Sequence, residues 1–178
     1  MGTARVTQLI PGSLQEVQTG WYDTSRWPAW VDGLDHVVSV EGDWPREGGS
    51  VAWMSGPAGR GEVTEQVTAY EELVGQTLHV QDTAISGSQT VSFTSVGEQG
   101  IEVQFELEYH LRYGSILAPL LDRVFIRRAI TSSMVKTLTR FGAELAARRA
   151  GSPSSLTSPS SVTSPSSATG DGACAPGQ

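Results

Sequence analysis

The chain has 178 residues, 38% of them hydrophobic, and a formal net charge of −7 at pH 7. This length is typical of one domain, and the acidic balance argues against nucleic acid as a partner, because proteins bind nucleic acid largely through basic residues that neutralise phosphates. The one cysteine, Cys174, excludes a disulfide within the chain, and a cysteine-based metal site is not expected.

The start of the chain shows no apolar leader, and no run approaches the ~18 apolar residues that a membrane-spanning helix needs. We therefore expect a cytoplasmic protein without stable membrane insertion.

A first strand is expected at residues 5–10, where the chain alternates and then reaches a Pro-Gly pair. Ser13 is followed three residues later by Glu16, the pattern of a capping box, and is expected to begin a short helix. A second short helix is expected at residues 27–30, with a proline in its first turn.

Six further strands are expected, each an alternating run bounded by turn residues. The last is the clearest, because every odd position from Ile101 to Leu111 is apolar or aromatic and every even position is polar or charged. This period is typical of a strand with one buried and one solvated face. The six runs are residues 37–41, 50–54, 62–70, 76–82, 88–96 and 101–111.

A long amphipathic helix is expected at residues 114–149. Its apolar residues recur at steps of three and four, which places them on one face. A single helix cannot bury such a stripe against itself, so we expect the strands to cover it and to leave a cavity between sheet and helix. The stripe comprises Leu117, Leu121, Val124, Val135, Leu138, Phe141 and Leu145, widened by Leu120, Phe125, Ile130 and Met134.

The rest of this helix is basic, with seven arginines and lysines against Asp122 and Glu144. The favoured interpretation is a solvated face that complements the helix dipole near its C-terminus. The alternative is contact with an anionic membrane or an acidic partner.

Residues 151–178 differ in composition from the rest of the chain. They are nearly all Ser, Pro, Thr, Gly and Ala, and a six-residue repeat occurs three times between Ser152 and Thr169. Such a segment has too little apolar surface to offset the entropy of ordering. We expect one folded domain over residues 1–150, followed by a disordered tail over residues 151–178.

These elements together predict an α+β fold. Three stretches carry a family resemblance: Asp-Thr-Ser-Arg-Trp-Pro-Ala-Trp at residues 23–30, Glu-Val-Thr-Glu-Gln-Val-Thr-Ala-Tyr-Glu at residues 62–71, and residues 114–129, which contain Leu-Asp-Arg-Val-Phe-Ile-Arg-Arg. With the order of elements, they resemble the START-like superfamily, also called SRPBCC, and within it the polyketide cyclase/dehydrase-like family. The resemblance covers about residues 4–149.

The resemblance implies a helix-grip fold, in which a seven-stranded antiparallel sheet curves around the C-terminal helix and two short helices close one end. It also implies a pocket for a hydrophobic or aromatic small molecule. It implies no single reaction, since the superfamily includes lipid carriers, hormone receptors and polyketide aromatase/cyclases. We expect no cofactor.

Five tryptophans between residues 21 and 53 have faces that suit a flat apolar ligand. For Trp27 and Trp30, packing of the short helices against the long helix is the favoured interpretation, whereas packing and ligand contact both remain open for Trp53. The expected faces of the strands and the long helix give the candidate lining residues, which are Trp53, Val63, Glu65, Val67, Val91, Phe93, Phe105, Leu107, Tyr109, Leu121 and Phe125.

Glu65 is the candidate for chemistry. Period two places it on the face of Val63 and Val67, where apolar surroundings would raise the pKa of its carboxyl and suit a general acid or base. The alternative is that a twist or bulge exposes it at a strand edge. The three histidines show no metal-ligand spacing, so no metal site is expected.

Three functions remain open at this point, one of them an interaction or membrane-surface module that uses the basic face of the long helix. The first is binding or carriage of a hydrophobic or aromatic small molecule or lipid in an internal cavity. The second is a polyketide cyclase or dehydratase that uses Glu65 as acid or base, which needs a partner group that the expected inward residues do not offer. The sequence favours binding, and it leaves the ligand and the oligomeric state open.

Overall fold

The computed structural model describes residues 1–57, 59–112 and 121–151, and for residues 121–124 it describes the backbone alone. Seven strands form one antiparallel sheet in the order β1-β7-β6-β5-β4-β3-β2. The strands are β1 (Gly2–Ile10), β2 (Leu34–Glu41), β3 (Ser50–Ser55), β4 (Glu62–Glu71), β5 (Gly75–Gln81), β6 (Ile85–Ser95) and β7 (Ile101–Leu111).

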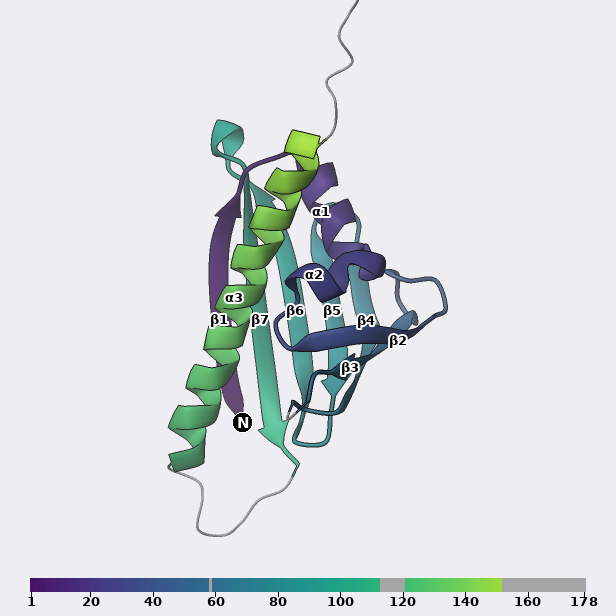
Figure 1. The fold of residues 1–178 in the computed structure, drawn as a ribbon, viewed down its shortest axis with the longest axis vertical. Helices are drawn as coiled ribbons and strands as arrows, with labels where there is room; N and C mark the ends of the chain where they lie inside the picture. The colour runs from purple at the N-terminus through teal and green to yellow at the C-terminus, as the bar shows by residue number, and fades with distance from the viewer. Residues whose placement is uncertain (58, 113–120, 152–178) are drawn as a thin grey trace, which may run out of the picture.

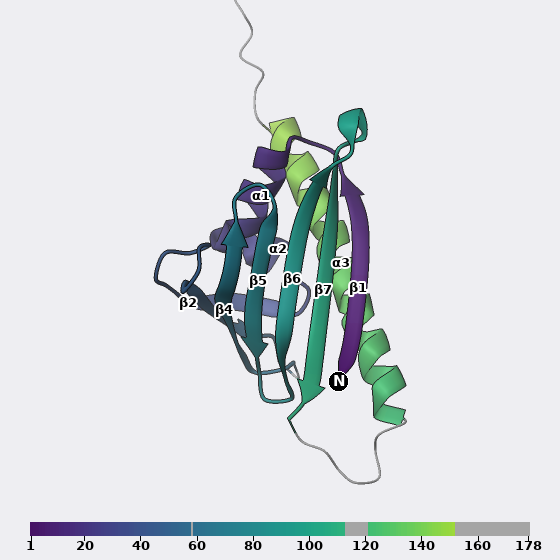
Figure 2. The same ribbon diagram turned by 180° about the vertical axis from the view of Figure 1, so that it is seen from behind.

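The long helix and the short helices that follow β1 lie on one face of this sheet (Figure 1). Figure 2, from the opposite side, shows the strands of the described part of the chain with the helices behind them. This arrangement confirms the predicted α+β architecture. The helical elements are α1 (Leu14–Tyr22), η1 (Thr24–Arg26), α2 (Trp27–Trp30), η2 (Gly97–Gln99) and α3 (Leu121–Gly151).

Local sequence sets the short helices as predicted. The Ser13 hydroxyl accepts a hydrogen bond from the Glu16 backbone N–H at 3.2 Å, which satisfies one of the free donors at the start of α1. Pro28 lies in the first turn of α2, where its missing N–H costs little. Together α1 and α2 present Trp21, Trp27 and Trp30 to the concave face of the sheet.

Three strands, β1, β2 and β6, begin three residues earlier than predicted, because a partner strand extends them. In β1, Gly2 pairs with Tyr109 of β7, and the ladder runs without interruption from there to Ile10. In β6, Gly87 pairs with the same residue, where a Cβ atom would lie 2.0 Å from the backbone oxygen of Glu108. Glycine has low strand propensity, so the close approach that requires it here also conceals the strand in the sequence.

The apolar stripe of α3 packs on the sheet and on the short helices. Met134, Leu138, Phe141 and Leu145 are all buried, at steps of three and four residues. The helix was predicted from residue 114, but residues 113–120, including Leu117 and Leu120, lie outside the described residues, as does the Val124 side chain.

Two members of the predicted stripe face solvent instead. Phe125 is 67% exposed and Val135 is 48% exposed. Phe125 lies nine positions before Met134, which at about 3.6 residues per turn places it on the opposite side of the helix. Val135 is displaced from Met134 by about 100°. Both were therefore wrongly assigned to the buried face.

Basic residues in the second half of α3 bind the helix to the N-terminal third of the chain. Arg140 lies 3.1 Å from the carboxylate of Asp32, and Arg149 lies 2.6 Å from that of Glu16. This half of the helix is therefore more than a solvated face, since its cations are used in tertiary ion pairs. Lys136 also pairs with Asp32, Arg148 with Asp23, and Glu144 of the helix with Arg26.

Candidate functional site

A cavity of about 310 Å³ lies between the concave face of the sheet, α2 and α3. All five tryptophans of the chain line it. The remaining walls come from strands β4 to β7, from the loops that carry Asp32 and Arg60, and from a stretch of α3 that contributes the smaller residues Ala129, Ser133 and Thr137. The tryptophans are Trp21, Trp27, Trp30, Trp44 and Trp53.

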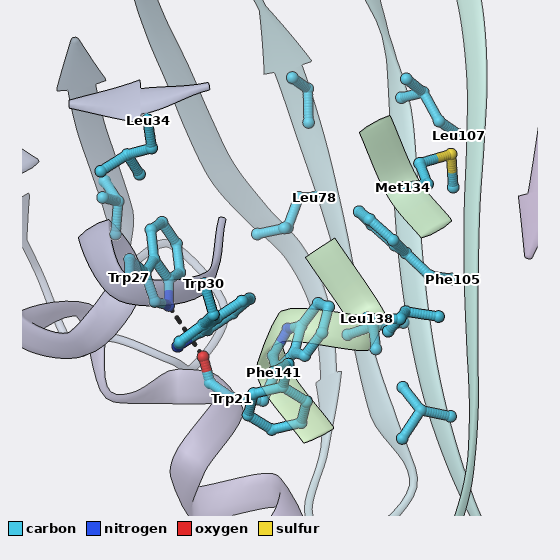
Figure 3. Packing of buried hydrophobic residues seen from close by; sticks show 14 of the residues in the cluster. Trp21, Trp27, Trp30, Leu34, Leu78, Phe105, Leu107, Met134, Leu138 and Phe141 are labelled. Atoms are coloured by element: carbon cyan, nitrogen blue, oxygen red, sulfur yellow. Dashed lines mark hydrogen bonds between the residues drawn. The ribbon is translucent and has the colours of Figure 1, made fainter. Parts of the chain in front are cut away.

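Three of these tryptophans also hold the short helices in place (Figure 3). The rings of Trp21 and Trp30 lie 5.0 Å apart, and each packs on Phe141 of α3, at 5.2 and 4.8 Å between centroids. The Trp27 indole N–H donates to the backbone oxygen of Trp21 at 2.9 Å. Core packing and cavity lining are thus both roles of the same side chains.

Glu65 lies at the cavity wall on β4, with its side chain inward as predicted. It is 6% exposed, and its carboxylate accepts a hydrogen bond from the indole N–H of Trp53 at 3.0 Å. The irregularity in β4 falls after Val67 and therefore does not expose Glu65. Burial raises the pKa of the Glu65 carboxyl, opposed by the Trp53 hydrogen bond and by the charge of Arg60.

Arg60 lies in the Gly-rich turn between β3 and β4 and also lines the cavity. Its guanidinium lies 5.3 Å from the centre of the Trp53 ring, in cation–π geometry, and 3.3 Å from a carboxylate oxygen of Asp82. Asp82 is fully buried and accepts two further hydrogen bonds, each 2.7 Å long, from the backbone N–H groups of Ala84 and Ile85. Arg60 is therefore held at the cavity by Asp82 and by the ring of Trp53.

Several polar atoms of the lining lack a partner within the described residues. They are the indole nitrogen of Trp30, the hydroxyl of Ser55 and the side-chain oxygen of Gln76. The amide nitrogen of Gln76 is fixed by the backbone oxygen of Pro45 at 2.6 Å, so its oxygen is held in one place. A buried unpaired polar group costs free energy, which a ligand with complementary groups would recover.

The predicted lining residues separate into those that the cavity brings together and those that it does not. Trp53, Glu65, Phe105 and Leu107 line it. Leu121 was also predicted, but its side chain lies outside the described residues. Four others are buried in the hydrophobic core without lining the cavity, namely Val63, Val67, Val91 and Phe93.

The contacts of Phe93 show the physical reason, since its ring is used for packing under α1. Phe93 lies 6.3 Å from Trp21 and 6.1 Å from Tyr22, ring to ring. Tyr109 is also inward but lines a second cleft, near the start of β1. Phe125 points to solvent, so its assignment to the cavity was wrong.

Sequence reasoning missed several polar residues of the lining, although the alternation contained a signal for two of them. Gln76 is in phase with Leu78 and Val80 of β5, and Gln89 is in phase with Val91 of β6. Their inward phase was therefore readable from the sequence, although neither was among the candidate lining residues. Arg60 and Asp32 lie outside the strands and helices, where periodicity gives no direction.

Within the described residues, no cluster of three or more His, Cys, Asp or Glu residues has the arrangement of a metal site. None of the helices that the structure describes combines the length and hydropathy needed to cross a membrane.

The matched family is polyketide cyclase / dehydrase and lipid transport, whose model covers residues 1–146. The chain belongs to this family. No curated protein matches it. The fold that the resemblance implied, a START-like helix grip, is confirmed by solved structures of the same architecture.

Three of these solved structures illustrate the range of the family fold. A START superfamily protein from Mycobacterium smegmatis aligns with a TM-score of 0.67 at 10% identity, over 83% of this chain and 99% of the other. A protein of unknown function from Staphylococcus aureus gives 0.67 at 10% identity, over 83% and 95%. The di-domain aromatase/cyclase of the steffimycin biosynthetic pathway gives 0.65 at 16% identity, over 84% of this chain and 51% of the other.

Proposed function

We propose that this member of the polyketide cyclase / dehydrase and lipid transport family binds or carries a flat, largely apolar small molecule in the cavity. The observation that supports the proposal most is the gathering of all five tryptophans around that one space. Indole faces provide a large apolar contact area with little conformational entropy to lose, and they favour stacking with a planar ligand.

The polar groups of the lining indicate that this ligand also carries hydrogen-bonding groups. In its neutral form, which burial favours, Glu65 donates a hydrogen bond, and the Trp30 indole N–H is a second donor. The Gln76 oxygen accepts, and Arg60 supplies a positive charge at one side. A ring system with carbonyl and hydroxyl substituents would satisfy more of these groups than an unsubstituted acyl chain.

Tryptophan fluorescence tests the proposal directly, with 1-anilinonaphthalene-8-sulfonate as the probe. Ser133→Phe would fill the cavity from α3, because Ser133 lines it, and should abolish energy transfer from the tryptophans to the probe. Val135→Phe, two residues along and facing solvent, is the matched control and should bind as the wild type does. Equal binding by both variants would place the probe elsewhere and contradict the proposal.

The second candidate is a polyketide cyclase or dehydratase in which Glu65 acts as acid or base. The buried carboxyl with its raised pKa supports this reading. Its neighbours do not complete a pair, since the guanidinium of Arg60 has donors but no acceptor and Asp32 is engaged by Arg140. We therefore favour binding over catalysis.

Glu65→Gln distinguishes the two functions. A carrier should keep its affinity for the probe, because glutamine retains an oxygen that can accept from Trp53. An enzyme that uses the carboxyl should lose turnover of a poly-ketone substrate by about 100-fold or more while still binding the probe. Turnover that survives the substitution would remove Glu65 from the chemistry.

A further inference from the structure

A second cleft lies on the other side of α3, between the start of β1, the end of β7 and the first half of the helix. It shares no lining residue with the cavity. We name it the β1–α3 cleft. Its lining consists of Met1, Gly2, Thr3, Arg5, Tyr109, Arg127, Arg128, Thr131 and Ser132.

The cations of α3 are used differently in the two halves of the helix. In the second half, Lys136, Arg140 and Arg149 each pair with a carboxylate of the N-terminal third. In the first half, Arg127 and Arg128 have no ion-pair partner among the described side chains, those of residues 1–57, 59–112 and 125–151. Both are exposed at the cleft.

The charge of the cleft is therefore not compensated by its own lining. Arg5 is neutralised by Glu106, 2.7 Å away. None of the described residues that line the cleft is acidic. This leaves the guanidinium groups of Arg127 and Arg128, two unit charges, directed at one space.

Hydroxyl groups complement these charges. Thr131 and Ser132 follow the two arginines by four residues each, so each hydroxyl lies one helical turn from a guanidinium on the same face. Tyr109 forms the floor of the cleft against Gly2, where any added Cβ would meet the phenol ring at 2.5 Å. Tyr109 is 3% exposed, and its hydroxyl has no partner among the described residues.

We propose that the β1–α3 cleft binds a phosphate group. Two planar guanidinium groups and three hydroxyls match a tetrahedral anion with several acceptor oxygens better than they match a single carboxylate. The unpaired hydroxyl of Tyr109 would gain the partner that the protein itself does not supply. The group belongs either to a soluble phosphate compound or to the headgroup of a phospholipid.

Binding is measured first with inorganic phosphate, by amide chemical-shift titration of the full chain at constant ionic strength. Arg127→Gln combined with Arg128→Gln should weaken the affinity at least about tenfold, since charge-assisted hydrogen bonds contribute on that order. Arg148→Gln combined with Arg149→Gln removes the same charge at the other end of α3 and should leave the affinity unchanged. Equal weakening by both pairs would show an effect of net charge alone and overturn the proposal.

Tyr109→Phe tests the floor of the cleft while keeping its packing. The variant should bind phosphate several-fold more weakly with an unchanged melting temperature, and wild-type affinity would overturn the assignment of the hydroxyl. Sedimentation with vesicles of about three parts phosphatidylcholine to one part phosphatidic acid distinguishes the two sources. Vesicle binding that the Arg127 and Arg128 substitutions abolish assigns a headgroup, and phosphate binding without vesicle binding assigns a soluble compound.

A protein that binds neither inorganic phosphate nor these vesicles would refute the site. That result would leave the cavity proposal untouched, because probe fluorescence reports on the tryptophans on the other side of α3.

Discussion

At Glu65, burial and polar neighbours act on the carboxyl in opposite directions. Removal from water raises the pKa, while the Trp53 hydrogen bond and the Arg60 charge lower it, and burial has the larger effect. The folded protein therefore binds more protons at this position than the unfolded chain does above pH 4.5. It follows that the free energy of unfolding falls as the pH rises from that value through the folded-state pKa.

Glu65→Gln should flatten this dependence. The glutamine cannot ionise, so the variant should be no less stable than the wild type at neutral pH and should lose less stability as the pH rises from 4.5 through the folded-state pKa of Glu65. Urea unfolding at a series of pH values measures the difference. Glu62→Gln, on the same strand but exposed, controls for the loss of one carboxyl. Parallel curves for wild type and Glu65→Gln would show that the carboxyl is not desolvated.

Trp53→Phe should raise the pKa of Glu65 further. The substitution keeps a ring against the cavity but removes the N–H that stabilises the ionised carboxylate. Carboxyl carbon NMR of the glutamates would follow the titration. Trp44→Phe serves as the control, because the Trp44 indole N–H donates to the backbone oxygen of Tyr22 and not to a carboxylate. A Glu65 titration that is equal in both variants would contradict the role assigned to Trp53.

At the scale of the elements, α3 shows how an exposed and a buried aromatic on one helix differ. Phe141 is 1% exposed and contacts both Trp21 and Trp30, so Phe141→Ala should destabilise the protein by about 3–5 kcal/mol. Phe125, 67% exposed, should tolerate alanine within about 0.5 kcal/mol. Chemical denaturation of the two variants is the measurement, and similar losses would place Phe125 in the packed core.

The elements also show what the sequence could predict. Strict alternation located β7 to the residue, and steps of three and four located Met134, Leu138 and Phe141 on the buried face. Alternation also placed Glu65 inward. It could not show that Phe93 packs under α1 while Phe105 faces the cavity, because both point to the same side of the sheet. That distinction depends on which helix covers which strand.

Loop residues were beyond the reach of periodicity. Arg60 enters the site through the turn that carries it and through Asp82, a residue of the β5–β6 connection far away in sequence. Asp32 reaches the cavity because Thr137 and Arg140 of α3 hold it. Such positions depend on contacts between distant segments, and a single sequence does not contain that information.

At the scale of the whole molecule, the buried core of the described residues extends to α3. The last buried residue of the described core is Leu145, the family match ends at residue 146, and Arg149 still binds Glu16. We therefore propose that residues 152–178 contribute nothing to the stability of the domain. A chain that ends at Gly151 should unfold within about 2 °C of the full chain.

Differential scanning calorimetry of the two chains tests this division. A chain that ends at Glu144 is the comparison, because it loses Leu145 together with the arginines that pair with Asp23 and Glu16. It should melt markedly lower. A large loss of stability on removing residues 152–178 alone would contradict the domain boundary.

The tryptophans of the cavity are not equally free to diverge. Trp21 and Trp30 pack on Phe141 and also line the cavity, so a substitution at either changes the stability of the fold together with the shape of the cavity. Trp53 instead contacts Glu65 and Arg60, in a corner formed by β3, β4 and their turn. Evolution can therefore alter specificity at this corner while the junction of α1, α2 and α3 stays constant. Homologues with new ligands should differ first at positions 53, 60 and 65.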